Sequence, residues 1–207
     1  MTGGQEADGI PLEMQGAYAD MAALYEDVAR NMTVVLDVHA GMGLVPSCSK
    51  GCDACCHQLV LSTVAEAREM AHALESLEPA PRSLVAGRID HWLEVTGPLR
   101  HALQQANDET LDEVVDTMAA QYWQQRIPCP FLVERACILH DARPLACRQH
   151  HALGDPVHCG EADGQNVDQM EAMEDLFFLA QDAITGEDAE IGIFPELVAM
   201  LSESRHP

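Results

Sequence analysis

The chain has 207 residues and a formal net charge of −23, from 34 acidic side chains against 11 lysines and arginines. This charge repels phosphate backbones and anionic lipid surfaces, so it argues against nucleic acid and membranes as partners. Only 4% of the residues are aromatic, so Leu, Val, Ala and Met must fill the interior, as they do where helices pack on helices.

We expect a mainly α fold: an irregular helical bundle with cysteine-rich loops, forming a single domain over residues 12–207 behind a flexible, Gly-rich segment at residues 1–11. The N-terminal residues lack the pattern of a secretion signal, and no apolar run reaches the length of about 18 residues that spans a bilayer. These features predict a cytoplasmic protein. Because the cytosol keeps thiols reduced, the eight cysteines indicate metal or redox chemistry rather than disulfides.

The first predicted helix has apolar residues at alternating spacings of three and four from Tyr18 to His39, and it ends near Gly41. His39 lies on the apolar face of this helix, so we expect a core or helix-end residue rather than a metal ligand. The next segment, residues 41–58, has loop composition and carries four cysteines.

A capping-box pattern at Thr63 and Glu66 predicts the start of a second helix, which Pro79 and Pro81 are expected to end. A third helical stretch covers residues 83–103, with an interruption expected at Gly97–Pro98 because proline removes a helical hydrogen bond. We therefore expect this stretch to consist of two helical pieces.

Further helices are predicted on both sides of the remaining cysteines. Asn107 or Asp108 is expected to cap a fourth helix, residues 131–140 to form a short β-hairpin, and Pro144 to begin a short helix. After a polar linker at residues 160–166, a helix is expected to open at Asp168-x-x-Glu171, and a last short one follows Pro195.

The first cysteine cluster comprises Cys48, Cys52, Cys55 and Cys56, all within nine residues. Two short spacings on a Gly-containing loop allow three thiolates to converge on one metal centre. Clustered cysteines of this kind are typical of metal sites, whereas buried inert thiols usually occur singly. A dithiol redox switch through Cys52-x-x-Cys55 is an alternative, although the βαβ pattern that usually accompanies it is absent.

The second cluster is sparser and lies in a locally basic segment. Its cysteines are Cys129, Cys137, Cys147 and Cys159, and the nearby arginines are Arg126, Arg135, Arg143 and Arg148. Several thiolates in one place accumulate negative charge and need cationic donors nearby. The arginines of this locally basic segment, in a chain that is acidic overall, supply such donors. The alternative is that the arginines pair with acidic helices.

The order, spacing and neighbours of the cysteines are specific. The motifs are Cys48-x3-Cys52-x2-Cys55-Cys56, Cys129-Pro130-Phe131-Leu132, Cys137-Ile138-Leu139-His140 and Arg143-Pro144-Leu145-Ala146-Cys147-Arg148. Over residues 44–160 this pattern resembles the YkgJ-type cysteine-cluster family of zinc- or iron-chelating CxxxCxxCC proteins. The resemblance implies metal chelation by eight cysteines, with Cys159 as the last member, and it implies no particular reaction.

The cysteine pattern is compatible with zinc and with an iron-sulfur cluster, and it does not distinguish between them. Eight thiolates would make two closed zinc sites or one bridged pair, whereas the first loop can hold three corners of a [4Fe-4S] cluster with Cys56 or a distant cysteine as the fourth. The spacing Cys48-x3-Cys52-x2-Cys55 also matches the cluster loop of radical S-adenosylmethionine enzymes. Those enzymes use a β/α barrel and usually an aromatic residue where this chain has Ala54, so we discount them.

Histidines also lie near the cysteines and could replace a thiolate as ligand. With a full thiolate set, we expect these histidines to lie around the metal site or in solvent: His57, His140, His150, His151 and His158. The leading hypothesis is thus a metal-binding protein whose partner is a metal ion, with no protein partner specified.

Two other functions remain open. One is an iron-sulfur enzyme with redox or protein methyl-transfer chemistry, since flagellin lysine methylases have a similar cysteine pattern. The other is a protein-interaction module in which the metal only cross-links the loops. This hypothesis predicts an exposed apolar patch beside the site. Phosphate-binding loops and the G-x-S-x-G and H-E-x-x-H motifs are absent, so any catalysis would depend on the metal.

Overall fold

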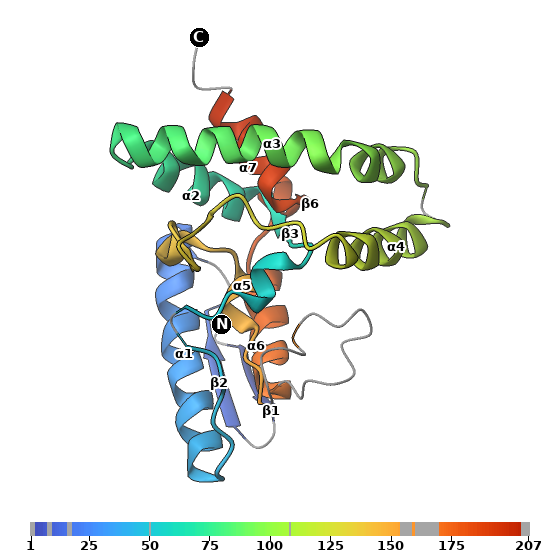
Figure 1. Cartoon of the computed structure of the whole chain (residues 1–207). Coiled ribbons are helices and arrows are strands. Elements are labelled where there is room, and N and C mark those ends of the chain that lie inside the picture. The colour runs from blue at the N-terminus through green and yellow to red at the C-terminus, as the bar shows by residue number, and fades with distance from the viewer. Residues whose placement is uncertain are drawn as a thin grey trace.

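The computed structural model describes residues 3–7, 10–15, 18–49, 51–107, 109–153, 159 and 170–203. These residues form a mainly helical structure with a few short strands, as expected (Figure 1). The helices are α1 (Met21–Gly41), α2 (Val64–Glu75), α3 (Pro79–Gln104), α4 (Leu111–Gln124), α5 (Leu145–Gln149), α6 (Glu171–Asp182) and α7 (Phe194–Glu203).

Short strands pair in antiparallel ladders. The pairs are β1 (Gly3–Ala7) with β2 (Ile10–Met14), β3 (Leu61–Thr63) with β6 (Ile191–Ile193), and β4 (Leu132–Val133) with β5 (Ala136–Cys137). The β4–β5 ladder confirms the hairpin predicted at residues 131–140. Its turn residues, Glu134 and Arg135, both have positive φ, of 49° and 63°, as a tight two-residue hairpin turn requires.

Near the N-terminus, where the sequence analysis expects a flexible segment at residues 1–11, the described residues pair as two strands. Residues 3–7 and 10–14 pair in register, with Gly3 opposite Met14 and Ala7 opposite Ile10. Ile10, Leu12 and Met14 are buried, because their alternating positions turn one face of β2 toward the core. The Asn31 side chain of α1 holds the strand by accepting from the Glu13 amide and donating to the Glu13 carbonyl.

The core divides into a lower and an upper part. In the lower part, α1, α6 and β2 bury one cluster that includes Leu24, Val35 and Leu176. In the upper part, α2, α3 and α7 bury a second cluster around Met70, Val85 and others. Figure 1 shows α3 lying across the top, α1 and α6 below, and α5 between the two parts. The cysteine-rich segments therefore lie where the two parts meet.

The third helix differs from its predicted form. α3 begins at Pro79, which suits a first helical turn, and it continues through Pro98 without interruption. Side-chain donors reach the carbonyl groups just before the proline: Thr96 Oγ1 donates to the Trp92 carbonyl at 2.7 Å, and Arg100 donates to the Leu93 carbonyl at 2.8 Å. Neither carbonyl is the one that Pro98 deprives of its helical donor, which belongs to Glu94, so these contacts add to the helix without replacing the missing bond.

The second helix begins as predicted, and its cap also reaches α5. Thr63 is the N-cap of α2 and forms the full capping box with Glu66. The Glu66 carboxyl group, only 3% exposed, accepts from the Thr63 amide at 2.8 Å and from the Leu145 amide at 2.5 Å. Because Leu145 is the first residue of α5, this one buried carboxyl group fixes the start of the helix that carries Cys147.

Two further expectations concern the helix starts and the membrane. Asn107 accepts from the Thr110 amide at 3.1 Å in the turn before α4, whose N-cap is Thr110. The predicted caps at Asp108 and Asp168, and the linker at 160–166, lie outside the described residues. Among the residues that the structure describes, no helix has the length and apolar character needed to cross a membrane.

Candidate metal centre

The first cysteine segment is a loop that closes into one short 3-10 turn. Gly51 has a φ of +92°, a conformation that favours glycine. The Cys52 amide donates to the Ser49 carbonyl at 2.9 Å, and the Cys56 amide donates to the Asp53 carbonyl at 3.0 Å. These turns place Cys55 and Cys56 in succession on the 3-10 helix Ala54–His57.

The second cysteine segment is attached to the first by backbone contact. The Cys129 amide donates to the Cys56 carbonyl at 2.8 Å, although 73 positions separate them in the sequence (129 − 56). Cys137 lies on β5 opposite Leu132, and Cys129 and Cys137 both pack against the upper hydrophobic cluster. Cys147 lies in α5, whose first amide is held by Glu66.

Cys48 and Cys159 meet on another side of the same loop. The Ala152 amide donates to the Cys48 sulfur at 3.4 Å, and the Ser47 amide donates to the Ala152 carbonyl at 2.9 Å. Cys159 is buried and packs with Ala152, Cys48 and Ala54. The Gln58 side chain, from the first loop, donates to the Cys159 carbonyl.

The two predicted cysteine clusters therefore converge. Cys159 contacts the first loop at Cys48, while Cys129, Cys137 and Cys147 lie near Cys55 and Cys56. The seven cysteines from Cys48 to Cys147 are free thiols. The structure thus brings together residues from both ends of a 112-residue stretch (residues 48 to 159, counted inclusively).

Burial and mutual repulsion keep most of these thiols neutral in the absence of metal. Burial, together with negative charge on Cys137 and Cys55, raises the pKa of Cys129 to about 12. Burial also raises the pKa of Cys147 well above its usual value, with Cys129 and Cys55 acting in the same direction. Each of these thiols therefore opposes ionisation of its neighbours, which requires them to lie within electrostatic reach of one another.

Cys55 and Cys56 form a coupled pair. A hydrogen bond between their side chains lowers the pKa of Cys55, because it stabilises the Cys55 thiolate, and the same bond raises the pKa of Cys56. One proton shared between adjacent sulfurs means that the pair ionises in two separate steps. The first step leaves one negative charge on the pair, held by the hydrogen bond between the two sulfurs.

The chemistry of the donor set fits a soft metal ion, although the thiols are not arranged in ligand geometry. Among the described residues, no three side chains of His, Cys, Asp or Glu are placed as they would be around a metal ion. The gathered donors are sulfur atoms, which zinc and iron-sulfur clusters prefer. A cation among them would replace several thiol protons and offset the repulsion between thiolates.

The histidines are placed in different ways. His57 and His151 contact backbone carbonyl groups through Nδ1, of Asp53 at 3.1 Å and of Gln149 at 3.2 Å. His140 contacts its neighbour Asp141. His150 has a buried Nε2 atom with no hydrogen-bond partner among the described residues, and burial lowers its pKa. His158 lies outside the described residues.

The core histidine of α1 is placed as predicted. His39 is 4% exposed, and its Nδ1 atom contacts the Val35 carbonyl of the preceding turn at 2.9 Å. The imidazole is thus accommodated within its own helix, which agrees with the expectation that His39 is a core residue rather than a ligand.

The four arginines near the second cluster have separate roles. Arg126 stacks on Trp123, Arg148 stacks on Tyr25, and Arg135 pairs with Asp53 at 3.3 Å. Arg143 differs, because its charge acts on the thiols of the cluster: burial raises the pKa of Cys137, and Arg143 opposes that rise. Of the four, Arg143 combines this effect with a buried nitrogen that lacks a hydrogen-bond partner in the described structure.

Two residues beside the site were missed by the sequence analysis. Arg88 of α3 donates from Nε to the Pro130 carbonyl at 3.0 Å, and its charge opposes the burial that raises the pKa of Cys129. Tyr122 of α4 is buried, and its pKa is raised first by burial and further by Cys129 and Cys56. Both residues lie on helices outside the cysteine-rich segments, so no local pattern marks them.

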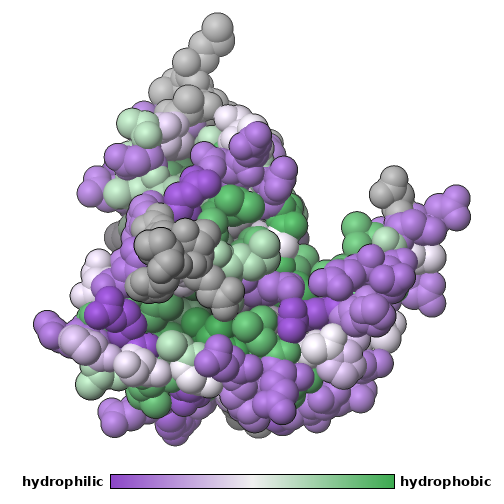
Figure 2. Space-filling model, turned by 90° about the horizontal axis from the view of Figure 1, so that it is seen from above, coloured by the Kyte–Doolittle hydropathy of each residue, from purple (hydrophilic) through white to green (hydrophobic). Residues whose placement is uncertain are grey.

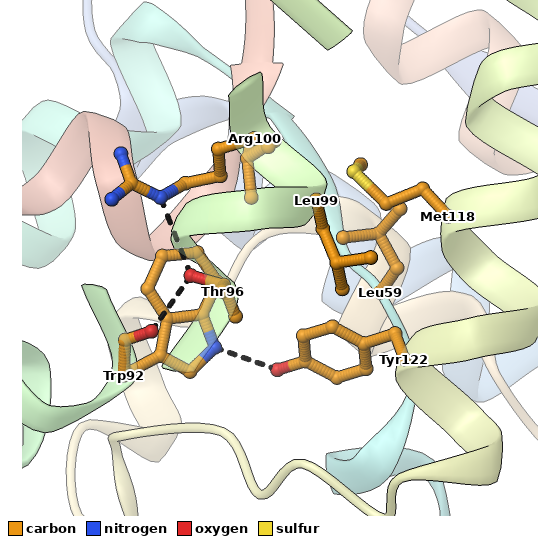
Figure 3. A pocket seen from close by; sticks show the side chains of 8 residues that line it. Leu59, Trp92, Thr96, Leu99, Arg100, Met118 and Tyr122 are labelled. Carbon is orange, nitrogen blue, oxygen red and sulfur yellow. Dashed lines mark hydrogen bonds between the residues drawn. The ribbon is translucent and has the colours of Figure 1, made fainter. Parts of the chain in front are cut away.

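Tyr122 is held by a hydrogen-bonded group between α3 and α4 (Figure 3). The Trp92 indole donates to the Tyr122 hydroxyl at 2.8 Å, and Arg100 donates from Nε to Thr96 Oγ1 at 3.3 Å. Leu59, Leu99, Met118 and Ile193 complete the lining, and these side chains leave no room for a water molecule. This region is therefore a packed wall beside the cysteines rather than a substrate pocket.

Exposed hydrophobic residues lie next to the first cysteine loop in the chain. Val38 and Met42, one turn apart at the end of α1, are 40% and 58% exposed, and Val45 is 64% exposed. Figure 2 shows a further hydrophobic recess, seen from above, beside the arm that carries the connection between α3 and α4. The interaction-module hypothesis predicts exposed apolar surface of this kind, but the structure identifies no partner for it.

A scan against protein-family models found no match to this chain, and searches of curated proteins and of solved structures found none either. The resemblance to the YkgJ-type family consequently stays a prediction from the cysteine motifs. The candidate site rests on the geometry of the chain itself.

Proposed function

We propose that this chain is a metal-binding protein in which the eight cysteines hold zinc or an iron-sulfur cluster. The observation that carries the proposal is the convergence of the two cysteine segments, joined by the hydrogen bond from the Cys129 amide to the Cys56 carbonyl. A cation among these thiols would stabilise their thiolate forms, which burial and mutual repulsion otherwise disfavour. The proposed ligands are Cys48, Cys52, Cys55, Cys56, Cys129, Cys137, Cys147 and Cys159.

The metal is identified by anaerobic purification followed by elemental analysis and visible spectroscopy. Brown protein with stoichiometric iron and sulfide selects a cluster and favours the iron-sulfur enzyme among the candidate functions. Colourless protein with stoichiometric zinc selects closed structural sites. Protein that contains neither metal, and that takes up neither after reduction and reconstitution, contradicts the proposal.

A single ligand substitution gives a quantitative prediction. We expect Cys52→Ser to lower metal content and melting temperature together, because part of the metal-binding energy is folding energy. The expected loss of affinity exceeds about 100-fold, since even groups that only hydrogen-bond to a ligand are worth about 10–100-fold. Elemental analysis and thermal unfolding, each with and without a chelator, measure the two effects.

The matched control is Val35→Thr, which replaces one methyl group by a hydroxyl group of similar size. Val35 lies on α1, and its side chain is 0% exposed. We expect this variant to lose about 1–3 kcal/mol of stability and to keep its metal content. A Cys52→Ser variant that keeps full metal content would remove Cys52 from the ligand set.

A further inference from the structure

Arg143 has a buried donor that the rest of the described chain does not use. The residue lies between the 3-10 helix His140–Ala142 and α5. Its backbone is fixed, because its amide donates to the His140 carbonyl at 3.3 Å and its own carbonyl accepts from Arg148 Nε at 2.8 Å. Its Nε atom, however, is buried without a hydrogen-bond partner among the described residues.

An unpartnered buried guanidinium nitrogen is costly, so it calls for a physical explanation. The neighbouring arginines do not share this property. Arg135 is paired with Asp53, and Arg148 is stacked on Tyr25. Of these three arginines, Arg143 is therefore the one with a buried side-chain nitrogen that has no hydrogen-bond partner in the described structure.

The charge of Arg143 acts on nearby thiols and on two other basic groups. Its charge acts on three cysteines: burial raises the pKa of Cys137 and Cys147, and Arg143 opposes both rises. It adds to the hydrogen bond that lowers the pKa of Cys55. Arg143 also helps burial to lower the pKa of Arg148 and of His151, so neither of these neighbours balances its charge.

We propose that Arg143 is a positioning residue whose Nε–H group donates to a thiolate sulfur of the metal-loaded site and whose charge balances it. This inference rests on the proposed function. Four thiolates around Zn²⁺ leave a net negative charge, and thiolate-held iron-sulfur clusters are also anionic, so a fixed cation stabilises the loaded site over the metal-free one. Arg143 thus favours an all-thiolate centre over one with neutral ligands.

The test compares Arg143→Gln, Arg143→Lys and Arg135→Gln. Reduced, metal-free protein is titrated with Zn²⁺ and Co²⁺ in competition with a chromophoric chelator. We expect Arg143→Gln to bind both ions about 10–100-fold more weakly. Arg143→Lys should recover part of the loss, because lysine keeps the charge without the planar fork. Arg135→Gln should stay within about twofold of the wild type, since that exposed arginine pairs with Asp53.

A second readout separates this role from a structural one. Metal-free Arg143→Gln should be at least as resistant to urea as the metal-free wild type, because the substitution removes a buried donor that has no partner in the described structure. If the protein binds iron and sulfide, the variant should also have a more negative reduction potential, because removal of a positive charge disfavours the added electron.

The outcomes distinguish the two proposals. Wild-type protein that binds neither ion contradicts the proposed function, and the inference fails with it. Wild-type protein that binds while Arg143→Gln binds equally well contradicts the inference alone. Metal-free Arg143→Gln that is less stable than the wild type, or does not fold, assigns Arg143 to the scaffold and also overturns the inference.

Discussion

Glu66→Ala should lower the free energy of unfolding by about 3–5 kcal/mol, because it leaves the buried amides of Thr63 and Leu145 without an acceptor, each at a cost of about 1–3 kcal/mol. Glu66 accepts from both amides and from the Thr63 hydroxyl, and it is 3% exposed. Its loss removes the Glu66 half of the α2 capping box and the attachment of α5 in one step. Two short-range contacts and one long-range contact depend on a single side chain.

Urea unfolding of metal-free protein measures the effect, and thermal unfolding should show a decrease of about 6–20 °C. The matched control is Glu69→Ala, one turn along the same helix, where the side chain is 36% exposed and only approaches His72 at 3.9 Å. That variant should stay within about 0.5 kcal/mol of the wild type. Equal stability of the two variants would mean that the Glu66 contacts contribute nothing beyond those of a surface carboxylate.

Metal-free protein should lose stability as the pH rises above about 8.5, where thiols of the unfolded chain ionise. Burial raises the pKa of Cys129 to about 12 in the folded chain. The unfolded state then releases a proton that the folded state keeps. The stabilisation from this raised pKa is full below about pH 8.5 and decreases until the folded pKa is passed, with a loss of about 2 kcal/mol by pH 10.

Urea unfolding in reductant and chelator at a series of pH values between 7.5 and 10 measures this dependence. Cys129→Ala should reduce the slope, whereas Val35→Thr should keep the full slope at a lower overall stability. Metal-loaded protein should show the opposite pH dependence of stability at low pH. Its cysteine ligands must lose their protons to bind metal, so acid should destabilise the loaded protein. A wild-type stability that stays constant to pH 10 without metal would mean that Cys129 is not buried as a neutral thiol.

Much of the helical structure could be predicted because helices are marked by nearby residues. The α2 cap, the apolar face of α1 and the β4–β5 hairpin each depend on residues a few positions apart. The pairing of β1 with β2 was missed although Ile10, Leu12 and Met14 alternate, because the Gly-rich composition outweighed a pattern of only three residues. The continuity of α3 through Pro98 was missed because the burial of Ile89, Trp92 and Leu99 against other elements, which outweighs one lost helical hydrogen bond, is not visible in the local sequence.

The cysteine positions alone indicated which residues could form the site, since the clustering of soft ligands at short spacing is a local property of the chain. Their meeting, and the choice of their neighbours, depended on the folded arrangement. Arg88, Tyr122 and Glu66 come from three different helices, and no spacing relates them to a cysteine. Four arginines near the second cluster are similar in sequence, yet the packing leaves Arg143 with the buried, unpartnered donor, because solvent exclusion and partner choice arise only when distant segments come together.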